Sequence, residues 1–124
     1  MCAILLSINP DHVENIMNGT KTYEFRKNAC KRPVEKILIY STKPIMRVVG
    51  EAEIEDILID DPETIWEKTR KRSGINKSFF DQYFANRNQA VAYELKNIVK
   101  YKEPKKLKEY GINNAPQSFR YIEE

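Results

Sequence analysis

The sequence is poor in the residues that build disulfide frameworks and metal sites. Its 124 residues include two cysteines, Cys2 and Cys30, with no Cys-x-x-Cys pair, and a single histidine, His12. Neither a disulfide framework nor a zinc site is supported, and we expect no metal and no cofactor. Because free cysteines suit a reducing compartment, we expect a cytoplasmic location.

Long apolar runs are also missing. Residues 3–8 form a short apolar stretch that lacks the basic segment of a signal peptide and is far too short to cross a bilayer. We therefore expect a first strand here and no membrane partner. We find no internal repeat, low-complexity tract or linker, so residues 1–124 are interpreted as one domain, long enough to bury a core.

Charge of one sign does not dominate the chain. A net charge of +3 is compatible with polyanion binding but falls short of strongly basic nucleic-acid-binding domains. Two basic clusters could contact a phosphate backbone, although a solvated helix end explains the first equally well. They are Lys68, Arg70, Lys71 and Arg72, and then Lys100, Lys102, Lys105, Lys106 and Lys108 near Tyr101 and Tyr110.

Helix signals divide the chain. Side chains suited to N-caps stand at Asn9, Asp61 and Asn76, and the first two precede a proline. They predict a short helix that ends before Gly19, a helix over residues 62–72, and a third helix after Asn76. The third helix carries four aromatic residues at helical spacing, which we expect to form its buried face: Phe79, Phe80, Tyr83 and Phe84.

Strand signals surround the two later helices. Gly50 lies inside a long strand pattern, where a bulge or barrel corner is expected. Strands around an inserted helical pair predict an α+β domain with a small, bent sheet or barrel of about five to six strands and three short helices. The predicted strands are residues 3–8, 20–27, 34–40, 45–59, 89–101 and 118–122.

The most informative constellation is Gly-x-Lys-x-x-Glu-x-Arg at residues 19–26. Glu24 and Arg26 would project from one face of a strand directly after Lys21. A surface ion pair of little energetic value is one interpretation. The other is a binding site, in which Lys21 and Arg26 donate to a phosphate or base edge while Glu24 accepts a hydrogen bond and orients the arginine.

Polar residues at strand ends are weaker candidates. Ser41 follows a buried strand, where a scaffold commonly holds binding groups, but turn chemistry favours the same residue type. Gln117 and Ser118 precede the last strand, whose Phe119 and Tyr121 we interpret as core residues. His12 is interpreted as a surface or capping residue, and Cys30 has no partner base that would make it a nucleophile. Trp66 is interpreted as core.

Four segments together resemble the ASCH domain family of the PUA-like superfamily. They are Ala-Ile-Leu-Leu-Ser-Ile-Asn-Pro at residues 3–10, Gly-Thr-Lys-Thr-Tyr-Glu-Phe-Arg-Lys at 19–27, Ile-Tyr-Ser-Thr-Lys-Pro at 39–44 and Ala-Pro-Gln-Ser-Phe at 115–119. They span nearly the whole chain in the expected order, which resembles a small, stand-alone ASCH protein. The resemblance implies a PUA-like β-barrel whose cleft is lined by the Gly-x-Lys-x-x-Glu-x-Arg segment.

The resemblance also implies an RNA- or nucleotide-binding protein, with a regulatory role. Carried over by position, the cleft residues are Lys21, Glu24 and Arg26, with weaker additions at strand ends: Ser7, Ser41, Gln117 and Ser118. Single-stranded or structured RNA is favoured over duplex DNA, because no helix-turn-helix pattern is present. The residues specify no oligomeric state.

A hydrolase is the alternative. Some relatives act as ribonucleases, and a distant branch hydrolyses the amide of N4-acetylcytidine with lysine, threonine and glutamate. The catalytic residues here would be Lys21 and Glu24, but Glu24 occupies the position of that branch's threonine, so the hydroxyl nucleophile is absent. A third interpretation, a protein-interaction domain, predicts no retention of nucleic acid even at low salt.

Overall fold

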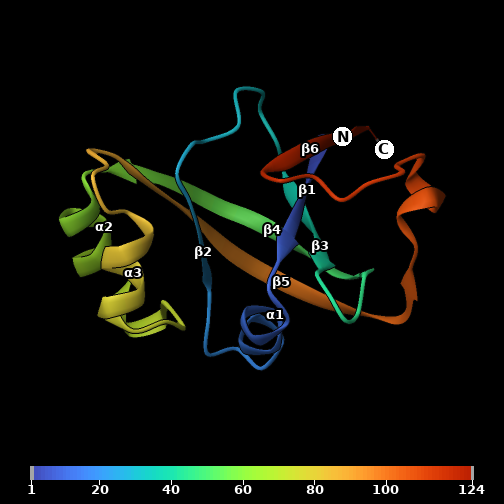
Figure 1. Ribbon diagram of the computed structural model, residues 1–124, viewed down its shortest axis with the longest axis horizontal. Helices are drawn as coiled ribbons and strands as arrows, with labels where there is room; N and C mark the ends of the chain where they lie inside the picture. Colours follow the sequence, from blue (N-terminus) through green and yellow to red (C-terminus); the bar gives the residue numbers. More distant parts are fainter. Residues whose placement is uncertain (1, 124) are drawn as a thin grey trace.

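A computed structural model describes residues 2–123 and folds them into a six-stranded mixed sheet with three α-helices (Figure 1). The predicted α+β class is confirmed, with its numbers of strands and helices. The strands are β1 (Cys2–Ile8), β2 (Tyr23–Arg26), β3 (Lys36–Ser41), β4 (Arg47–Asp60), β5 (Ala90–Lys105) and β6 (Phe119–Glu123). The helices are α1 (Pro10–Met17), α2 (Pro62–Thr69) and α3 (Lys77–Tyr83), with short 3-10 helices η1 (Arg70–Arg72) and η2 (Leu107–Tyr110).

The sheet is open. Its strand order is β2-β5-β4-β3-β1-β6, in which β1 and β3 are parallel and the other neighbours are antiparallel. A barrel needs continuous pairing around the circle. Within residues 2–123 no ladder joins the edge strands β2 and β6. The predicted barrel closure is therefore not confirmed, although the strands of the α+β prediction are present.

Gly50 marks a bend in the long β4–β5 ribbon, as predicted. The registers of β4 with both of its neighbours shift beside this residue. A Cβ atom added at Gly50 would overlap the carbonyl oxygen of Val99 and lie 2.7 Å from Cε of Met17 in α1. Only glycine therefore lets the bent ribbon approach α1 this closely.

The three predicted caps are confirmed. The side chain of Asn9 accepts a hydrogen bond from the backbone at the start of α1, and Asp61 and Asn76 do the same for α2 and α3. The helix predicted over residues 62–72 is divided, because its last three residues tighten into η1. Such 3-10 turns are common at helix C-termini.

The strand predicted over residues 20–27 begins only at Tyr23. Gly19, at φ +86°, ends the turn after α1, and the backbone N–H of Lys21 then donates to Asn15. The N–H of Thr22 donates to the carbonyl of Arg72 in η1. These two residues are therefore tied to helices on either side. Strand pairing with β5 covers the following four residues, and one further hydrogen bond runs from the N–H of Leu95 to the carbonyl oxygen of Thr22.

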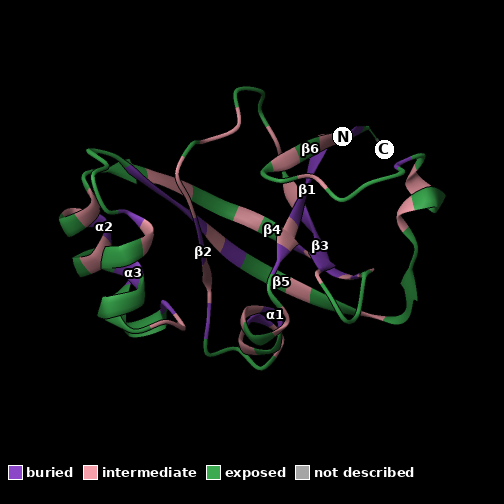
Figure 2. Cartoon of the chain, in the orientation of Figure 1, coloured by how far each residue is buried: buried purple, intermediate pink, exposed green. Residues whose placement is uncertain are grey.

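Buried side chains line the strands while the outer helix faces are exposed (Figure 2). Phe80 and Phe84 of the α3 region pack with Phe25 of β2, and the partly buried Trp66 joins them. The prediction that Phe79 is buried is wrong, because its side chain is 46% exposed. Phe80 and Phe84, four residues apart, share the sheet-facing side, and Phe79 is rotated about 100° from it.

Candidate functional site

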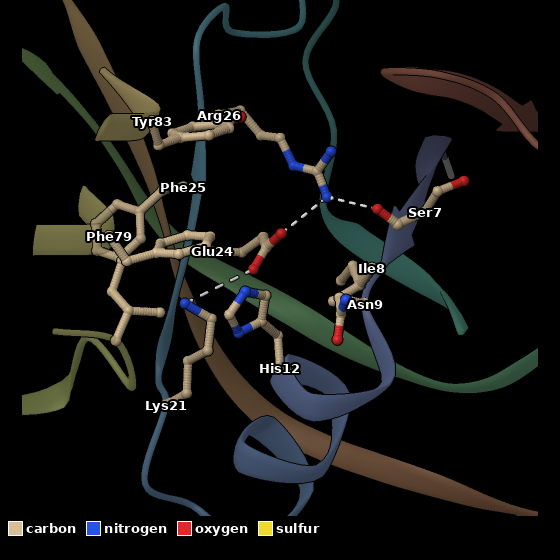
Figure 3. A pocket seen from close by; sticks show the side chains of 11 residues that line it. Ser7, Ile8, Asn9, His12, Lys21, Glu24, Phe25, Arg26, Phe79 and Tyr83 are labelled. Carbon is tan, nitrogen blue, oxygen red and sulfur yellow. Dashed lines mark hydrogen bonds and ion pairs between the residues drawn. The ribbon is translucent and has the colours of Figure 1, made fainter. Parts of the chain in front are cut away.

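A cavity of about 240 Å³ lies where the end of β1, the start of α1, β2 and α3 meet (Figure 3). Its wall on the β2 side carries the three charged residues predicted from the sequence, and α3 supplies aromatic rings. The lining residues are Ser7, Ile8, Asn9, His12, Lys21, Glu24, Phe25, Arg26, Ile75, Phe79 and Tyr83. The structure therefore brings Lys21, Glu24 and Arg26 to one hollow.

Lys21 is held in the cavity wall from several sides. Its side chain is almost fully buried, and its Nζ donates to the carbonyl oxygen of Ser73 over 2.8 Å. The same atom lies 3.8 Å from Oε1 of Glu24 and 4.7 Å from the ring centroid of Phe25. Gly74 packs against the lysine stem, where a Cβ would lie 2.7 Å from Cγ of Lys21. The ammonium group is therefore fixed in place.

Glu24 bridges the two cations. Nη2 of Arg26 donates to Oε2 of Glu24 over 2.8 Å and to the carbonyl oxygen of Ser7 over 2.9 Å (Figure 3). The predicted shared face of Glu24 and Arg26 is confirmed. The alternative of a solvent-exposed ion pair does not hold, because their side chains are 7% and 14% exposed. Removing one partner of a buried ion pair leaves an uncompensated buried charge, so the stability of the fold depends on all three side chains being present.

One donor of Arg26 has no partner. Its Nε is buried and makes no hydrogen bond with any residue from 2 to 123. Buried polar groups in proteins are nearly always hydrogen-bonded, so an orphan donor of this kind calls for an explanation. Arg26 lines the cavity. The Nε atom is itself buried, so a bound molecule would reach it only after the Arg26 side chain turned.

The protonation of Lys21 depends on opposing influences. Burial lowers the pKa of the Lys21 ammonium and outweighs the nearby Glu24 carboxylate, which raises it, while Arg26 lowers it further. The net shift is downward from 10.5. A lysine whose pKa is lowered is better suited to give or take a proton near neutral pH than an exposed one.

His12 and the aromatic wall were not predicted to belong to the site. His12 is half-buried and lines the cavity, and its ring meets that of Phe79 edge to face at 5.4 Å. Burial, followed by the charge of Lys21, lowers its pKa below 6.5, so the neutral imidazole is favoured at neutral pH. Phe79 and Tyr83 stand four residues apart, a spacing that places both on one helix face. This four-residue spacing was the one sequence signal that both rings belong to the same wall.

The weaker candidates do not gather at the cavity. Ser7 lines it, but its hydroxyl donates to the carbonyl oxygen of Pro116 over 2.8 Å. Ser41 is buried at the end of β3, outside the cavity. Gln117 is exposed and Ser118 lines a different hollow. The carboxyl ends of the parallel strands β1 and β3 are neighbours, with Ile8 opposite Ser41, yet of these two strands only β1 borders the hollow.

Residues 2–123 contain neither a metal-binding cluster of side chains nor a membrane-spanning helix. Within residues 2–123 no group of three or more histidine, cysteine or acidic side chains is arranged to hold a metal ion. No helix in that range is both long and apolar enough to cross a bilayer.

The architecture is that of an ASCH domain. It superimposes on the crystal structure of ASCH from Zymomonas mobilis with a TM-score of 0.89 and 25% identity, over 98% of this chain and 88% of that one. Two single-substitution variants of that protein match with TM-scores of 0.87. The predicted resemblance to ASCH domains is confirmed.

The chain belongs to the family described as "Domain of unknown function (DUF365)", whose model matches residues 1–124. An "ASCH domain-containing ribonuclease" of Zymomonas mobilis subsp. mobilis is 28% identical over 95% of this chain and 82% of its own length. An "ATP synthase subunit alpha" and a "Large ribosomal subunit protein uL22", both of Ureaplasma parvum serovar 3, are 33% and 32% identical over 96% of this chain. The chain spans 15% and 39% of the lengths of these two curated relatives.

Proposed function

We propose that the cavity binds one nucleotide of a single-stranded RNA, as a binding module with a regulatory role. The observation that carries the proposal is the buried Lys21–Glu24–Arg26 set facing an aromatic wall across one hollow. With Lys21 protonated, two cations and one carboxylate leave one net positive charge, which favours an anionic ligand. The ASCH-domain relative that is named a ribonuclease supports RNA as the ligand class.

The size of the cavity favours a single nucleotide unit. At about 240 Å³ it lies below the range of about 300–1,000 Å³ typical of small-molecule pockets. An unpaired base could enter it from the strand, as in most sequence-specific RNA recognition. A base in a duplex could not enter, because its Watson–Crick edge is paired and its ring faces are stacked.

The two walls supply different interactions. Phe79 is exposed enough to meet a base face, and Tyr83 borders the same hollow. On the opposite wall, Arg26 offers its guanidinium group to a base or phosphate oxygen, and its unpartnered Nε–H becomes available when the side chain turns toward the ligand. Glu24, already oriented by Arg26, offers carboxylate lone pairs to an amino or hydroxyl group.

The proposal is tested with a fluorescently labelled RNA 12-mer of mixed sequence, titrated at low salt and followed by anisotropy. Arg26→Lys keeps the charge and removes the planar donor set, so affinity should fall by about tenfold. Arg70→Lys, at a half-exposed arginine beside Glu67, is the matched control and should bind like the wild type. Absence of wild-type binding, or equal affinity of the two variants, would refute the proposed site.

A hydrolase at the same site is the second candidate. The lowered pKa of Lys21 favours it, with Lys21 transferring a proton and Glu24 serving as base. The relative named a ribonuclease points in the same direction. Incubation of the labelled RNA, and separately of N4-acetylcytidine, with wild type, Lys21→Ala and Glu24→Gln decides between the two. Turnover lost in both variants supports catalysis, and salt-sensitive binding without turnover supports the module.

We place this activity in a reducing compartment, the cytoplasm, and on one domain covering residues 1–124. Support comes from Cys2 and Cys30, both of which are free thiols.

A further inference from the structure

A second hollow, the flanking groove, lies between the connection from β2 to β3 and the start of β6. It encloses about 850 Å³, more than the cavity does. Its side chains are amides, a hydroxyl, cations and aromatic rings, and none of the described residues lining it carries a carboxylate. The residues used below to define it are Asn28, Arg32, Gln89, Ser118, Phe119 and Tyr121.

The floor of the flanking groove is a rigid aromatic platform. The guanidinium carbon of Arg32 lies 4.2 Å from the ring centroid of Tyr121, and Phe119 meets that ring edge to face at 5.2 Å. The hydroxyl of Tyr121 accepts backbone hydrogen bonds from Lys31 and Arg32 over 2.8 and 3.0 Å. The loop is therefore fastened to β6 before any ligand arrives, which lowers the entropic cost of binding.

Arg32 remains available to a ligand. Its side chain is 59% exposed, and the carboxylate of Glu123, 3.5 Å away, belongs to a side chain that is 77% exposed. Ion pairs of such exposure contribute little, so the guanidinium can turn to a phosphate or stack on a base without a large loss.

The flanking groove lies near the cavity along the chain. Ser7 lines the cavity, and its hydroxyl holds the carbonyl of Pro116, two residues before Ser118 of the groove. On the other side, Arg26 of the cavity is two residues before Asn28 of the groove, a chain distance of at most about 7 Å. In Figure 1 the connection that follows β2 rises beside β6.

We propose that the flanking groove binds the nucleotide next to the one in the cavity, on the same RNA strand. This proposal rests on the proposed function of the cavity. The base stacks on the Arg32–Tyr121 platform, since aromatic and guanidinium faces accept any base. The amides of Asn28 and Gln89 present donors and acceptors to its edge. The linking phosphate passes between the two hollows beside the guanidinium group of Arg26.

Nuclear magnetic resonance separates the two subsites. The ¹⁵N-labelled full chain is titrated with the four ribonucleoside 5′-monophosphates and then with dinucleotides of the same bases. The monophosphates should shift the backbone amide of Arg26, and the dinucleotides should in addition shift those of Asn28 and Ser118. Shifts that stay confined to the cavity with every dinucleotide would overturn the second subsite and leave the cavity intact.

A matched pair of variants gives the energetic test. Arg32→Ala keeps the backbone N–H that binds Tyr121 and should weaken the RNA 12-mer by about tenfold, with unchanged binding of the monophosphates. Arg120→Ala removes an exposed arginine from the opposite face of β6 and should bind like the wild type. Equal affinities of the two variants would refute the flanking groove. Failure of the wild type to bind either monophosphates or RNA would refute the cavity, and the groove with it.

Discussion

Positive charge is held differently in the cavity and at the lysine-rich end of the molecule. In the cavity, Lys21 is 1% exposed, and a carbonyl, a carboxylate and an aromatic ring surround its ammonium group. At the lysine-rich end, made of Lys100, Lys102, Lys105, Lys106 and Lys108, the side chains are exposed. There Lys105 lies 5.3 Å above the ring of Tyr101.

The comparison shows that the number of charges does not define a site. The lysine-rich end holds more cations, but each keeps most of its hydration and its rotamer freedom. The cavity holds two, both desolvated and both fixed by Glu24. Only the cavity has a geometry that can select a ligand, and only the cavity depends on all of its charged side chains remaining in place.

Removing the bridging carboxylate should produce the largest effect. Glu24→Gln leaves Lys21 and Arg26 buried without a counter-charge, so the free energy of unfolding should fall by about 3–5 kcal/mol. Glu103→Gln, at an exposed position near the lysine-rich end, should cost about 0.5 kcal/mol or less. Urea unfolding curves measure both. Equal urea midpoints for Glu24→Gln and Glu103→Gln would mean that burial of the charges does not make the cavity more costly to disrupt than the lysine-rich end.

Two glycines sharpen the contrast through sterics. Gly74 and Gly111 both adopt positive φ, at 70° and 74°, so alanine costs about 1–2 kcal/mol of backbone strain at either position. At Gly74 the added Cβ would also overlap the stem of Lys21, whereas nothing lies within 4 Å at Gly111. Thermal unfolding should show a larger loss for Gly74→Ala. Equal losses would indicate that Lys21 is free to move aside.

The pH dependence of stability reports on Lys21. Since burial lowers the pKa of Lys21 in the folded state, the unfolded chain binds more protons between that lowered value and 10.5. Stability should therefore gain a rising contribution as the pH increases toward 10.5, and Lys21→Met should remove that contribution. Urea unfolding of both proteins between pH 7 and 10 measures the difference. Parallel profiles would show that the lysine titrates normally.

The smallest effect is expected at the lysine-rich end. The double variant Lys100→Ala, Lys102→Ala removes two exposed charges, so its free energy of unfolding should stay within about 0.5 kcal/mol of wild type. If RNA extends this far, the slope of log affinity against log salt becomes shallower, with a similar loss for every RNA sequence. A sequence-dependent loss would move base recognition to this end and away from the cavity.

Local chemistry explains which elements could be predicted from the sequence. The caps at Asn9, Asp61 and Asn76 and the bend at Gly50 depend on neighbouring residues, and each appears where expected. Two-residue alternation likewise places Glu24 and Arg26 on one face of β2, which is the part of the site that sequence periodicity can reveal.

The rest of the cavity depends on tertiary packing. His12 and Phe79 are 67 positions apart, and only the tertiary fold, which brings α1 and α3 to one hollow, brings their rings together. Their residue types alone suggested a surface histidine and a core phenylalanine. Ser41 and Gln117 were predicted from their positions at strand ends, and both lie outside the cavity. A position at a strand end does not tell whether that end borders a hollow.

The unpartnered Nε–H of Arg26 gives the most direct test of the cavity. Its resonance can be followed in ¹H–¹⁵N spectra while the single-stranded RNA 12-mer is added. If the cavity is the RNA site, this resonance shifts in proportion to bound RNA, because the ligand changes the surroundings of the guanidinium group that lines the cavity. A resonance that stays unchanged while RNA saturates the protein would place the binding site elsewhere.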